Sequence, residues 1–364
     1  MSEALVGPLH EPLFTGSSER KPEPTLPEPL EPRLRENGHY VPDTALIYAV
    51  DVALMLGQPL LLTGEPGTGK TTLAAALAHE RFDDRFLEMQ VKSDSTREDL
   101  LYHIDQVGIF RDSQAGRTRR KLLEYLTFRP LGEAILRACP ADVELISRSG
   151  AALRGDEQIL EEIFGPLDGR VPTVADLLPS HRGKNSERVV VLIDEIDKAP
   201  RDTPNDLLEE FDRMSFAIPE FNLSVKLPRN APRPVVIVTS NSEKSLPEAF
   251  LRRCAYHHIA FPGDRELRAI IASRLSPKRI DDESLGQLLK LFADLRTNMQ
   301  RRPGTAELLQ WLSMIEHLQP RESFVSQETL EHLIPVLAKN EVDSLAARRT
   351  ITDWIRERKV GRPD

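Results

Sequence analysis

The residues from Gly64 to Thr71 read Gly-Glu-Pro-Gly-Thr-Gly-Lys-Thr and match the pattern G-x-x-x-x-G-K-[ST]. The glycines let the backbone curl until its N–H groups point inward, where they can bind an anion. Lys70 would add a cation for the β- and γ-phosphates of a nucleotide, and the Thr71 hydroxyl would ligate Mg²⁺. The segment therefore predicts a phosphate-binding loop. Its candidate nucleotide-binding residues are Gly64, Pro66, Gly67, Thr68, Gly69, Lys70, Thr71 and Thr72.

A pair of carboxylates, Asp194 and Glu195, follows the apolar run at 189–193. In a doubly wound sheet, ligands lie at the carboxyl ends of the strands, which is where this pair would sit. Asp194 can hold Mg²⁺ because this hard cation prefers oxygen ligands. Glu195 would then orient or deprotonate an attacking water. Alone, such a pair would as often be structural, but together with the phosphate loop it predicts Mg²⁺-dependent hydrolysis of ATP.

A third polar position, Asn241, follows the apolar run at 235–239. Its side-chain amide could donate a hydrogen bond to the γ-phosphate or to the attacking water. The alternative is an ordinary Asn-Ser turn after a strand.

The elements that would position these residues are short apolar strands at 59–63, 86–91, 189–193, 235–239 and 256–261. Because these runs do not alternate with polar residues, they predict a parallel sheet covered on both faces. Helical stretches between them, such as 71–79, predict an α/β doubly wound fold. After Pro262 the strand signals stop. Two helical stripes replace them, made of Leu285, Leu288, Leu289, Phe292 and Leu295, and of Leu308, Leu309, Leu312 and Ile315.

Three parts are therefore expected: a tail at 1–38, an α/β nucleotide-binding domain at 39–262 and a smaller all-α domain at 263–364. The tail is acidic and proline-rich, a composition that buries too little apolar surface to fold. The stretch at 139–187 exceeds what the α/β domain needs, and we expect an accessory insert there, with a helix at 157–164. Ser93 or Ser95 could cap a helix that begins shortly after the second strand.

Composition limits the possible settings of the chain. No apolar run approaches 18 residues and the N-terminus lacks a signal sequence, so we expect no membrane association and a cytoplasmic protein. The two cysteines, Cys139 and Cys254, form no motif and suit a reducing compartment. The net charge of −9 makes nucleic-acid binding an unfavoured expectation. His257 and His258 would lie on opposite faces of a strand, which excludes shared metal coordination.

The phosphate loop, the acidic pair and Asn241, in this order along the chain, resemble the AAA+ superfamily. The amino-acid sequences of the motifs resemble those of its MoxR-like branch. The resemblance rests on the phosphate loop, on Ile193-Asp-Glu-Ile-Asp-Lys-Ala199 and on Leu246-Pro-Glu-Ala-Phe-Leu-Arg-Arg253. It implies a P-loop αβα domain with five parallel strands, followed by a helical lid. It also implies a homo-oligomeric ring, commonly a hexamer, that remodels a protein or protein complex. An adaptor of the von Willebrand A type is a further partner that the resemblance suggests.

By position in the motifs, Asn241 resembles the sensor-1 residue and Arg253 resembles the arginine finger. Because Arg252 is adjacent, the arginine finger could instead be that residue. The segment 40–42, which includes Val41, resembles the stretch that lines the adenine site. The sensor-2 arginine has no clean match, although Arg301 or Arg302 could reach the γ-phosphate. By position in the family, the segment at 92–103 resembles a pore-facing insert, and the alternative is a plain capped helix. The segment at 216–228 resembles a second pore-facing element and is expected to form a hairpin.

Two functions from different classes fit these residues. The first is an ATP-driven remodelling enzyme. The second is a nucleotide-gated signalling scaffold with slow turnover, which would need the same catalytic residues. A nucleic-acid motor is a third possibility, opposed by the acidic charge and by the lack of a DNA-binding motif in the sequence.

Overall fold

The computed structural model describes residues 40–114, 121–153, 157–242, 244–275, 280–318 and 325–360. The chain divides into two compact units. The α/β unit contains Pro42–Gly64 and Lys70–Ile259, and the helical unit contains Glu65–Gly69 and the chain from Ala260, together with residues 40–41. The tail expected at 1–38 lies outside the described residues.

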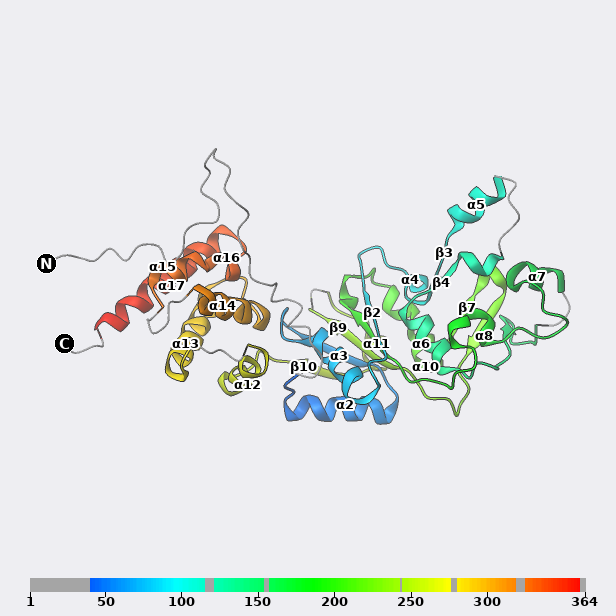
Figure 1. Cartoon of the computed structure of the whole chain (residues 1–364), viewed down its shortest axis with the longest axis horizontal. Coiled ribbons are helices and arrows are strands. Elements are labelled where there is room, and N and C mark those ends of the chain that lie inside the picture. The colour runs from blue at the N-terminus through cyan, green and yellow to red at the C-terminus, as the bar shows by residue number, and fades with distance from the viewer. Residues whose placement is uncertain are drawn as a thin grey trace. The chain divides into compact units, whose positions relative to one another are not determined.

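Within the described residues, a sheet of five parallel strands lies at the centre of the α/β unit (Figure 1). Its order is β10-β1-β9-β6-β2. The strands are β1 (Leu60–Gly64), β2 (Phe86–Gln90), β6 (Val190–Asp194), β9 (Val235–Ser240) and β10 (Ala255–Ile259). The central strands β1, β9 and β6 are almost entirely buried, as expected where both faces of a parallel sheet are covered. The predicted α/β fold with a parallel sheet is therefore confirmed.

Helices α3 (Lys70–Arg81) and α6 (Pro130–Ala138) pack against the central strands, and α2 (Thr44–Leu56) packs against the edge strand β10. Asp43 caps α2 by accepting a hydrogen bond from the Leu46 N–H at 2.7 Å. The apolar side chains of α2 are only partly buried. Ile47 is 44% exposed, because the helix packs at the edge of the sheet and only a narrow part of its surface is covered.

The expected insert at 139–187 folds together with the expected hairpin at 216–228. The hairpin consists of β7 (Ser215–Ile218) and β8 (Leu223–Lys226), and β5 (Ile146–Ser147) of the insert pairs with β8. Insert residues such as Leu145, Ile163 and Val174 are buried in the same core as the central sheet. The insert is thus an integral part of the α/β unit. It also contains α7 (Glu157–Phe164), α8 (Val174–Leu177) and the 3-10 turn η2 (Pro179–His181).

A short antiparallel pair, β3 (Tyr102–Ile104) and β4 (Leu126–Phe128), carries α5 (Gln106–Gln114) away from the rest of the α/β unit (Figure 1). The helix before it, α4 (Arg97–Leu101), is capped by Thr96 and Asp99. The expectation of a Ser93 or Ser95 cap was wrong, because the Ser95 hydroxyl instead accepts a bond from the Lys92 N–H. The remaining short elements of the unit are η1 (Leu122–Tyr125), η3 (Ile196–Lys198), α9 (Thr203–Asp206), α10 (Leu208–Arg213), η4 (Pro219–Phe221) and α11 (Glu248–Leu251).

From Ala260 onward, the described residues form helices and no strand. These are α12 (Asp264–Arg274), α13 (Asp282–Asn298), α14 (Thr305–Leu318), α15 (Gln327–His332), α16 (Ile334–Leu337) and α17 (Glu341–Val360). Both predicted stripes, on α13 and α14, are buried in one core, and Trp311 and Trp354 pack in that core. The prediction of an all-α second part is confirmed. No helix in the described parts of the chain is long and apolar enough to cross a membrane.

Candidate active site

The polar residues predicted for catalysis lie at one edge of the central sheet. Strand β1 ends at Gly64, β6 ends at Asp194 and β9 ends at Ser240, while α3 begins at Lys70. Because the strands are parallel, their carboxyl ends meet at this edge. The fold thereby brings together Lys70, Thr71, Asp194, Glu195 and Asn241, which are up to 171 positions apart in the sequence.

The Lys70 side chain is buried, and its ammonium group donates a hydrogen bond to the Gly64 carbonyl at 2.9 Å. Burial lowers the pKa of Lys70, while the negative charges of Asp194, Asp197 and Glu195 act in the opposite direction. The lysine is therefore held close to the start of the loop. A phosphate would offer this desolvated cation a stronger partner than a neutral carbonyl.

The Thr71 hydroxyl lies 3.3 Å from both carboxylate oxygens of Asp194. A hydroxyl and a carboxylate are hard oxygen donors of the kind that Mg²⁺ selects. Mg²⁺ usually combines one or two protein ligands with water and substrate phosphates, a number of ligands that Thr71 and Asp194 could supply. The next residue on α3, Thr72, is half-buried.

Glu195 has a left-handed backbone, with φ at 59° and ψ at 48°. Residues other than glycine seldom adopt this conformation, and such positions cluster at functional sites. Its Oε1 accepts a hydrogen bond from the Asn241 amide at 3.0 Å. Its Oε2 accepts from Gln90 at 3.0 Å and from the Lys198 ammonium at 2.5 Å.

These donors determine the charge of Glu195. Burial by itself would raise the pKa of the carboxyl group, but the hydrogen bonds from Lys198, Gln90 and Asn241 and the charge of Lys198 outweigh it. The pKa of Glu195 therefore lies below the usual value, and the side chain is ionised at neutral pH. An ionised carboxylate can accept a proton, as a general base requires.

Three residues around the carboxylates were missed by sequence reasoning: Gln90, Lys198 and Thr239. Thr239 is fully buried, accepts a hydrogen bond from the Glu195 N–H at 2.9 Å and donates one to Asp194 Oδ1. Gln90 and Thr239 stand at or next to the ends of β2 and β9. A polar residue at or near the carboxyl end of a predicted parallel strand is a signal that could have indicated Gln90 and Thr239, as it did Asp194 and Asn241.

The segment Glu65–Gly69 has the backbone that its glycines permit. Gly67 has φ at 77° and Gly69 has φ at 91°, both in the left-handed region. A Cβ atom at Gly69 would lie 3.3 Å from the Tyr40 ring, so a side chain there would be both strained and crowded. Thr68 is buried and donates to the Glu65 carbonyl at 2.9 Å. Pro66 is exposed and Val41 is half-buried beside Tyr40, which is the residue that contacts the loop.

Two arginines of the helical unit contact Glu65. Arg296 donates to one oxygen of this carboxylate at 2.6 Å, and Arg302 lies 3.4 Å from the other. Arg296 was not among the candidates for a sensor-2 residue, because it lies inside α13. Of the two that were, Arg302 reaches the loop and Arg301 uses its backbone N–H to contact Asp343.

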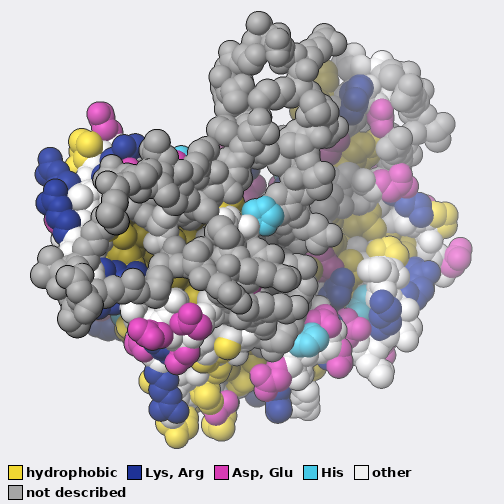
Figure 2. All heavy atoms as spheres, turned by 60° about the vertical axis from the view of Figure 1, so that its left-hand side comes forward, with side chains coloured by type: hydrophobic (Ala, Val, Ile, Leu, Met, Phe, Trp, Pro, Cys, Tyr) yellow, Lys and Arg dark blue, Asp and Glu magenta, His cyan; other side chains and the backbone are white. Residues whose placement is uncertain are grey.

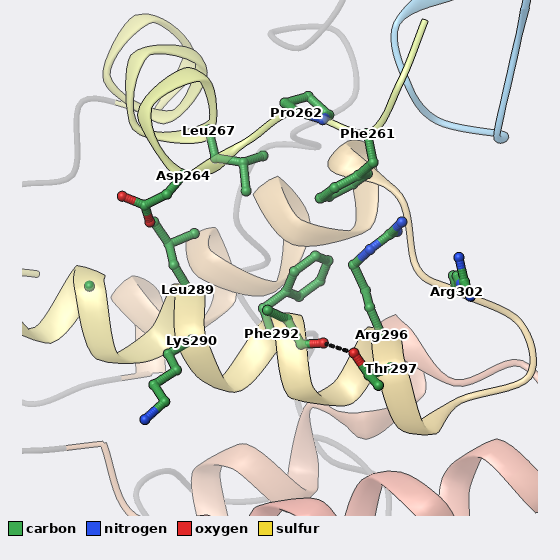
Figure 3. Close-up of a pocket in the computed structure, with 12 residues that line it drawn as sticks. Phe261, Pro262, Asp264, Leu267, Leu289, Lys290, Phe292, Arg296, Thr297 and Arg302 are labelled. Atoms are coloured by element: carbon green, nitrogen blue, oxygen red, sulfur yellow. Dashed lines mark hydrogen bonds between the residues drawn. The ribbon is translucent and has the colours of Figure 1, made fainter.

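Arg296 also lines a cavity of about 470 Å³ in the helical unit (Figure 3). Its guanidinium lies over the Phe261 ring, 3.5 Å from the ring centroid. Lys290, Phe292 and Thr297 of α13 also line this cavity. The cavity therefore combines apolar and aromatic walls with cationic groups.

Arg253 follows α11, and its guanidinium pairs with Asp212 at 2.8 Å. Its neighbour Arg252 is more open to solvent, with 80% of its side chain exposed and Glu248 as an ion-pair partner at 3.7 Å. Within the described part of the chain, neither of these ion pairs involves Asp194 or Glu195. The structure thus places Arg253 in a surface ion pair, and its role as an arginine finger remains a prediction.

On the face seen in Figure 2, basic and acidic side chains are interspersed over the described surface.

Comparison with known proteins identifies the family. A family model of the AAA domain, dynein-related subfamily, matches residues 59–254. No curated protein sequence matched the chain. Among solved structures, a candidate ATPase from Cytophaga hutchinsonii aligns at 12% identity with a TM-score of 0.35, covering 90% of this chain and 92% of its own. NtrX from Brucella abortus, solved in complex with ADP, aligns at 12% identity with a TM-score of 0.40, covering 91% of this chain and 64% of its own.

The family match extends from the residue before β1 to the residue before β10, and so includes the phosphate loop, Asp194, Glu195 and Asn241. Because the match covers more than half of the 364 residues, the protein belongs to the AAA family, in its dynein-related subfamily, and is an ATP hydrolase.

Proposed function

We propose that this ATPase is Mg²⁺-dependent and resembles the MoxR-like branch in function. It would assemble into a homo-oligomeric ring, a hexamer as is common in that branch, and remodel a protein or protein complex. The observation that carries the catalytic part is the position of Glu195. Its carboxylate is held by Asn241 and is adjacent in sequence to Asp194, which lies 3.3 Å from the Thr71 hydroxyl. A base, a metal ligand and a polar orienting group thus occupy one sheet edge.

The roles of the residues follow from their chemistry. Bound ATP and Mg²⁺ would supply the phosphoryl group and the cation that neutralises its oxygens. Lys70 would exchange the Gly64 carbonyl for phosphate oxygens, while Thr71 and Asp194 would hold the metal. Glu195 would take the proton of the attacking water, and Asn241 would orient either group through its amide. The loop residues Gly64, Pro66, Gly67, Thr68, Gly69 and Thr72, with Val41, would complete the nucleotide site.

Ring assembly is proposed because Arg253 would act on the nucleotide of a neighbouring copy. A guanidinium supplied across an interface stabilises charge on the transferred phosphoryl group. In this structure Arg253 is partly exposed and paired with a surface carboxylate, so it is accessible to a second chain. The amino-acid sequences of the motifs from Ile193 to Ala199 and from Leu246 to Arg253 support the MoxR-like assignment. A protein substrate, or an adaptor of the von Willebrand A type, would be the partner.

The second candidate function, a nucleotide-gated scaffold with slow turnover, is favoured by one observation. Both oxygens of Glu195 already accept hydrogen bonds, one from Asn241 and the other from Gln90 and Lys198. A base whose Oε2 is paired with the Lys198 ammonium would deprotonate water slowly until that ion pair opens.

Partner capture separates the two functions. Glu195→Gln protein with ATP would be used as bait, with Lys70→Ala protein as the matched control that does not bind nucleotide. Under the remodelling function, the captured protein raises the ATPase rate of the wild type and is altered in fold or assembly as ATP is consumed. A captured partner that leaves the rate unchanged and keeps its own structure supports the scaffold. Native mass spectrometry of the bait tests the ring directly, and a monomer under all nucleotide conditions contradicts it.

A further inference from the structure

We propose that Thr239 is a positioning residue of the ATPase site, which sets the geometry of Asp194 and Glu195 through a single hydroxyl group. The inference rests on the proposed roles of those two carboxylates. It concerns a residue that lies in the apolar strand β9 and that no motif in the sequence singles out.

The position of Thr239 follows from the register of the sheet. Ile193 of β6 pairs with Val238 of β9, and Thr239 therefore stands beside the end of β6. Its side chain has no exposed surface. A buried hydroxyl needs hydrogen-bond partners, and valine would satisfy the strand equally well without that requirement. The hydroxyl therefore has a use that strand formation does not explain.

The hydroxyl has one proton and two lone pairs, and the structure uses both capacities. The O–H donates to Asp194 Oδ1 and the oxygen accepts from the Glu195 N–H at 2.9 Å. The direction is fixed, because a backbone N–H can only donate and an ionised carboxylate can only accept. One atom thus joins the predicted metal ligand to the backbone of the predicted base.

The second contact occurs where the backbone leaves the sheet. Glu195 has φ at 59°, a conformation that turns the chain away from the strand direction after Asp194. The Glu195 N–H is therefore partnered by a side chain of the adjacent strand. Without the Thr239 hydroxyl, this N–H would lose its partner and Asp194 would lose a donor. Both carboxylates would then be less well oriented.

Partners that orient a metal ligand typically change metal affinity or activity by about 10–100-fold when removed. Thr239→Ala and Thr239→Ser form the matched pair, because they differ only by the oxygen atom. We expect the alanine variant to lose about 10–100-fold in kcat and to need a higher Mg²⁺ concentration for half-maximal rate. The serine variant should recover most of both. Binding of ATP in the absence of Mg²⁺, measured by calorimetry, should be equal in the two variants.

Thr203→Val is the control for loss of a buried hydroxyl as such. Thr203 is also buried and donates to the Ser95 carbonyl at 3.1 Å, away from the carboxylates. Thr239→Val keeps the branched shape and serves if alanine destabilises the strand, with folding of each variant checked by thermal melting. If folded Thr239→Ala or Thr239→Val protein keeps the wild-type kcat and Mg²⁺ requirement, as Thr203→Val should, the inference is wrong. The same holds if serine fails to recover the activity.

Glu195→Gln and Asp194→Asn distinguish this failure from failure of the proposed function. When both are inactive and the Thr239 variants behave as wild type, the site stands and only the role of Thr239 is overturned. When Glu195→Gln itself hydrolyses ATP at the wild-type rate, the proposed site is wrong, and the role of Thr239 is overturned with it.

Discussion

The Asn241 amide donates a hydrogen bond to Glu195 Oε1 at 3.0 Å, across 46 positions of sequence. The two residues follow neighbouring strands, β9 and β6. Asn241 therefore holds the predicted base in place. Side chains fixed in advance in this way do not have to reorganise during the reaction, which is a main source of catalytic rate.

Lys70→Ala should abolish ATP binding, because it removes the main cation facing the β- and γ-phosphates. Isothermal titration calorimetry with ATP and Mg²⁺ measures this directly. Lys92→Ala removes an exposed lysine that follows β2 and is the matched control. Unchanged ATP affinity in folded Lys70→Ala protein would contradict the assignment of the phosphate loop.

Glu195→Gln should keep ATP and Mg²⁺ binding but slow hydrolysis by about 10²-fold or more, the scale of a lost general base. The amide retains a carbonyl oxygen for the Asn241 donor but cannot take up a proton. Phosphate release under single-turnover conditions checks the chemical step. Glu88→Gln, on the exposed side of β2, controls for the loss of a negative charge. A rate close to wild type would assign the base to another residue.

The pH dependence should reveal the contact between Lys198 and Glu195. The pKa of Glu195 is lowered, so the active ionised form persists below the usual glutamate value of about 4.3. Lys198→Met removes a charge and a hydrogen bond that both lower this pKa. The pKa should therefore rise, and the acid limb of kcat/KM should move to higher pH.

The measurement is kcat/KM from pH 3 to 8, a range that extends below the usual glutamate pKa, with folding followed by circular dichroism at each pH. Lys92→Met is the control and should leave the acid limb unchanged. An acid limb that stays in place in Lys198→Met protein would mean that Glu195 does not set it.

Mixing of variants tests whether Arg253 acts on a neighbouring subunit. Arg253→Ala and Glu195→Gln should each be inactive, since an arginine finger contributes about 10³-fold or more. With random mixing at equal amounts, about a quarter of the interfaces in a ring would join an intact Glu195 to an intact Arg253. Partial ATPase activity should therefore reappear. Arg252→Ala, tested in parallel, decides the register between the two arginines.

Arg253 would act within its own chain if a monomeric protein, confirmed as such by light scattering, hydrolysed ATP at the full rate and lost that activity on Arg253→Ala. This result would remove the main catalytic reason for a ring.

The sequence by itself determined the α/β fold and the residue types of the site. Apolar runs without alternation predicted the central strands β1, β6 and β9, which are buried on both faces. Helical stripes predicted the all-α part after Pro262, because a helix buried on one face leaves a different pattern. The phosphate loop and the acidic pair were readable because each is local. Their chemistry depends on residues that are adjacent or a few positions apart.

What only the tertiary structure decided depends on contacts between distant strands and helices. Thr239 and Gln90 contact the acidic pair only because the sheet places β9 and β2 on either side of β6. The insert at 139–187 belongs to the α/β core because β5 adds to a hairpin about 75 positions later, a pairing that no local pattern encodes. Arg296 reaches Glu65 across 231 positions from inside a helix whose pattern indicates packing alone. Side-chain partners at such separations depend on tertiary packing, which cannot be read from the local patterns of a single sequence.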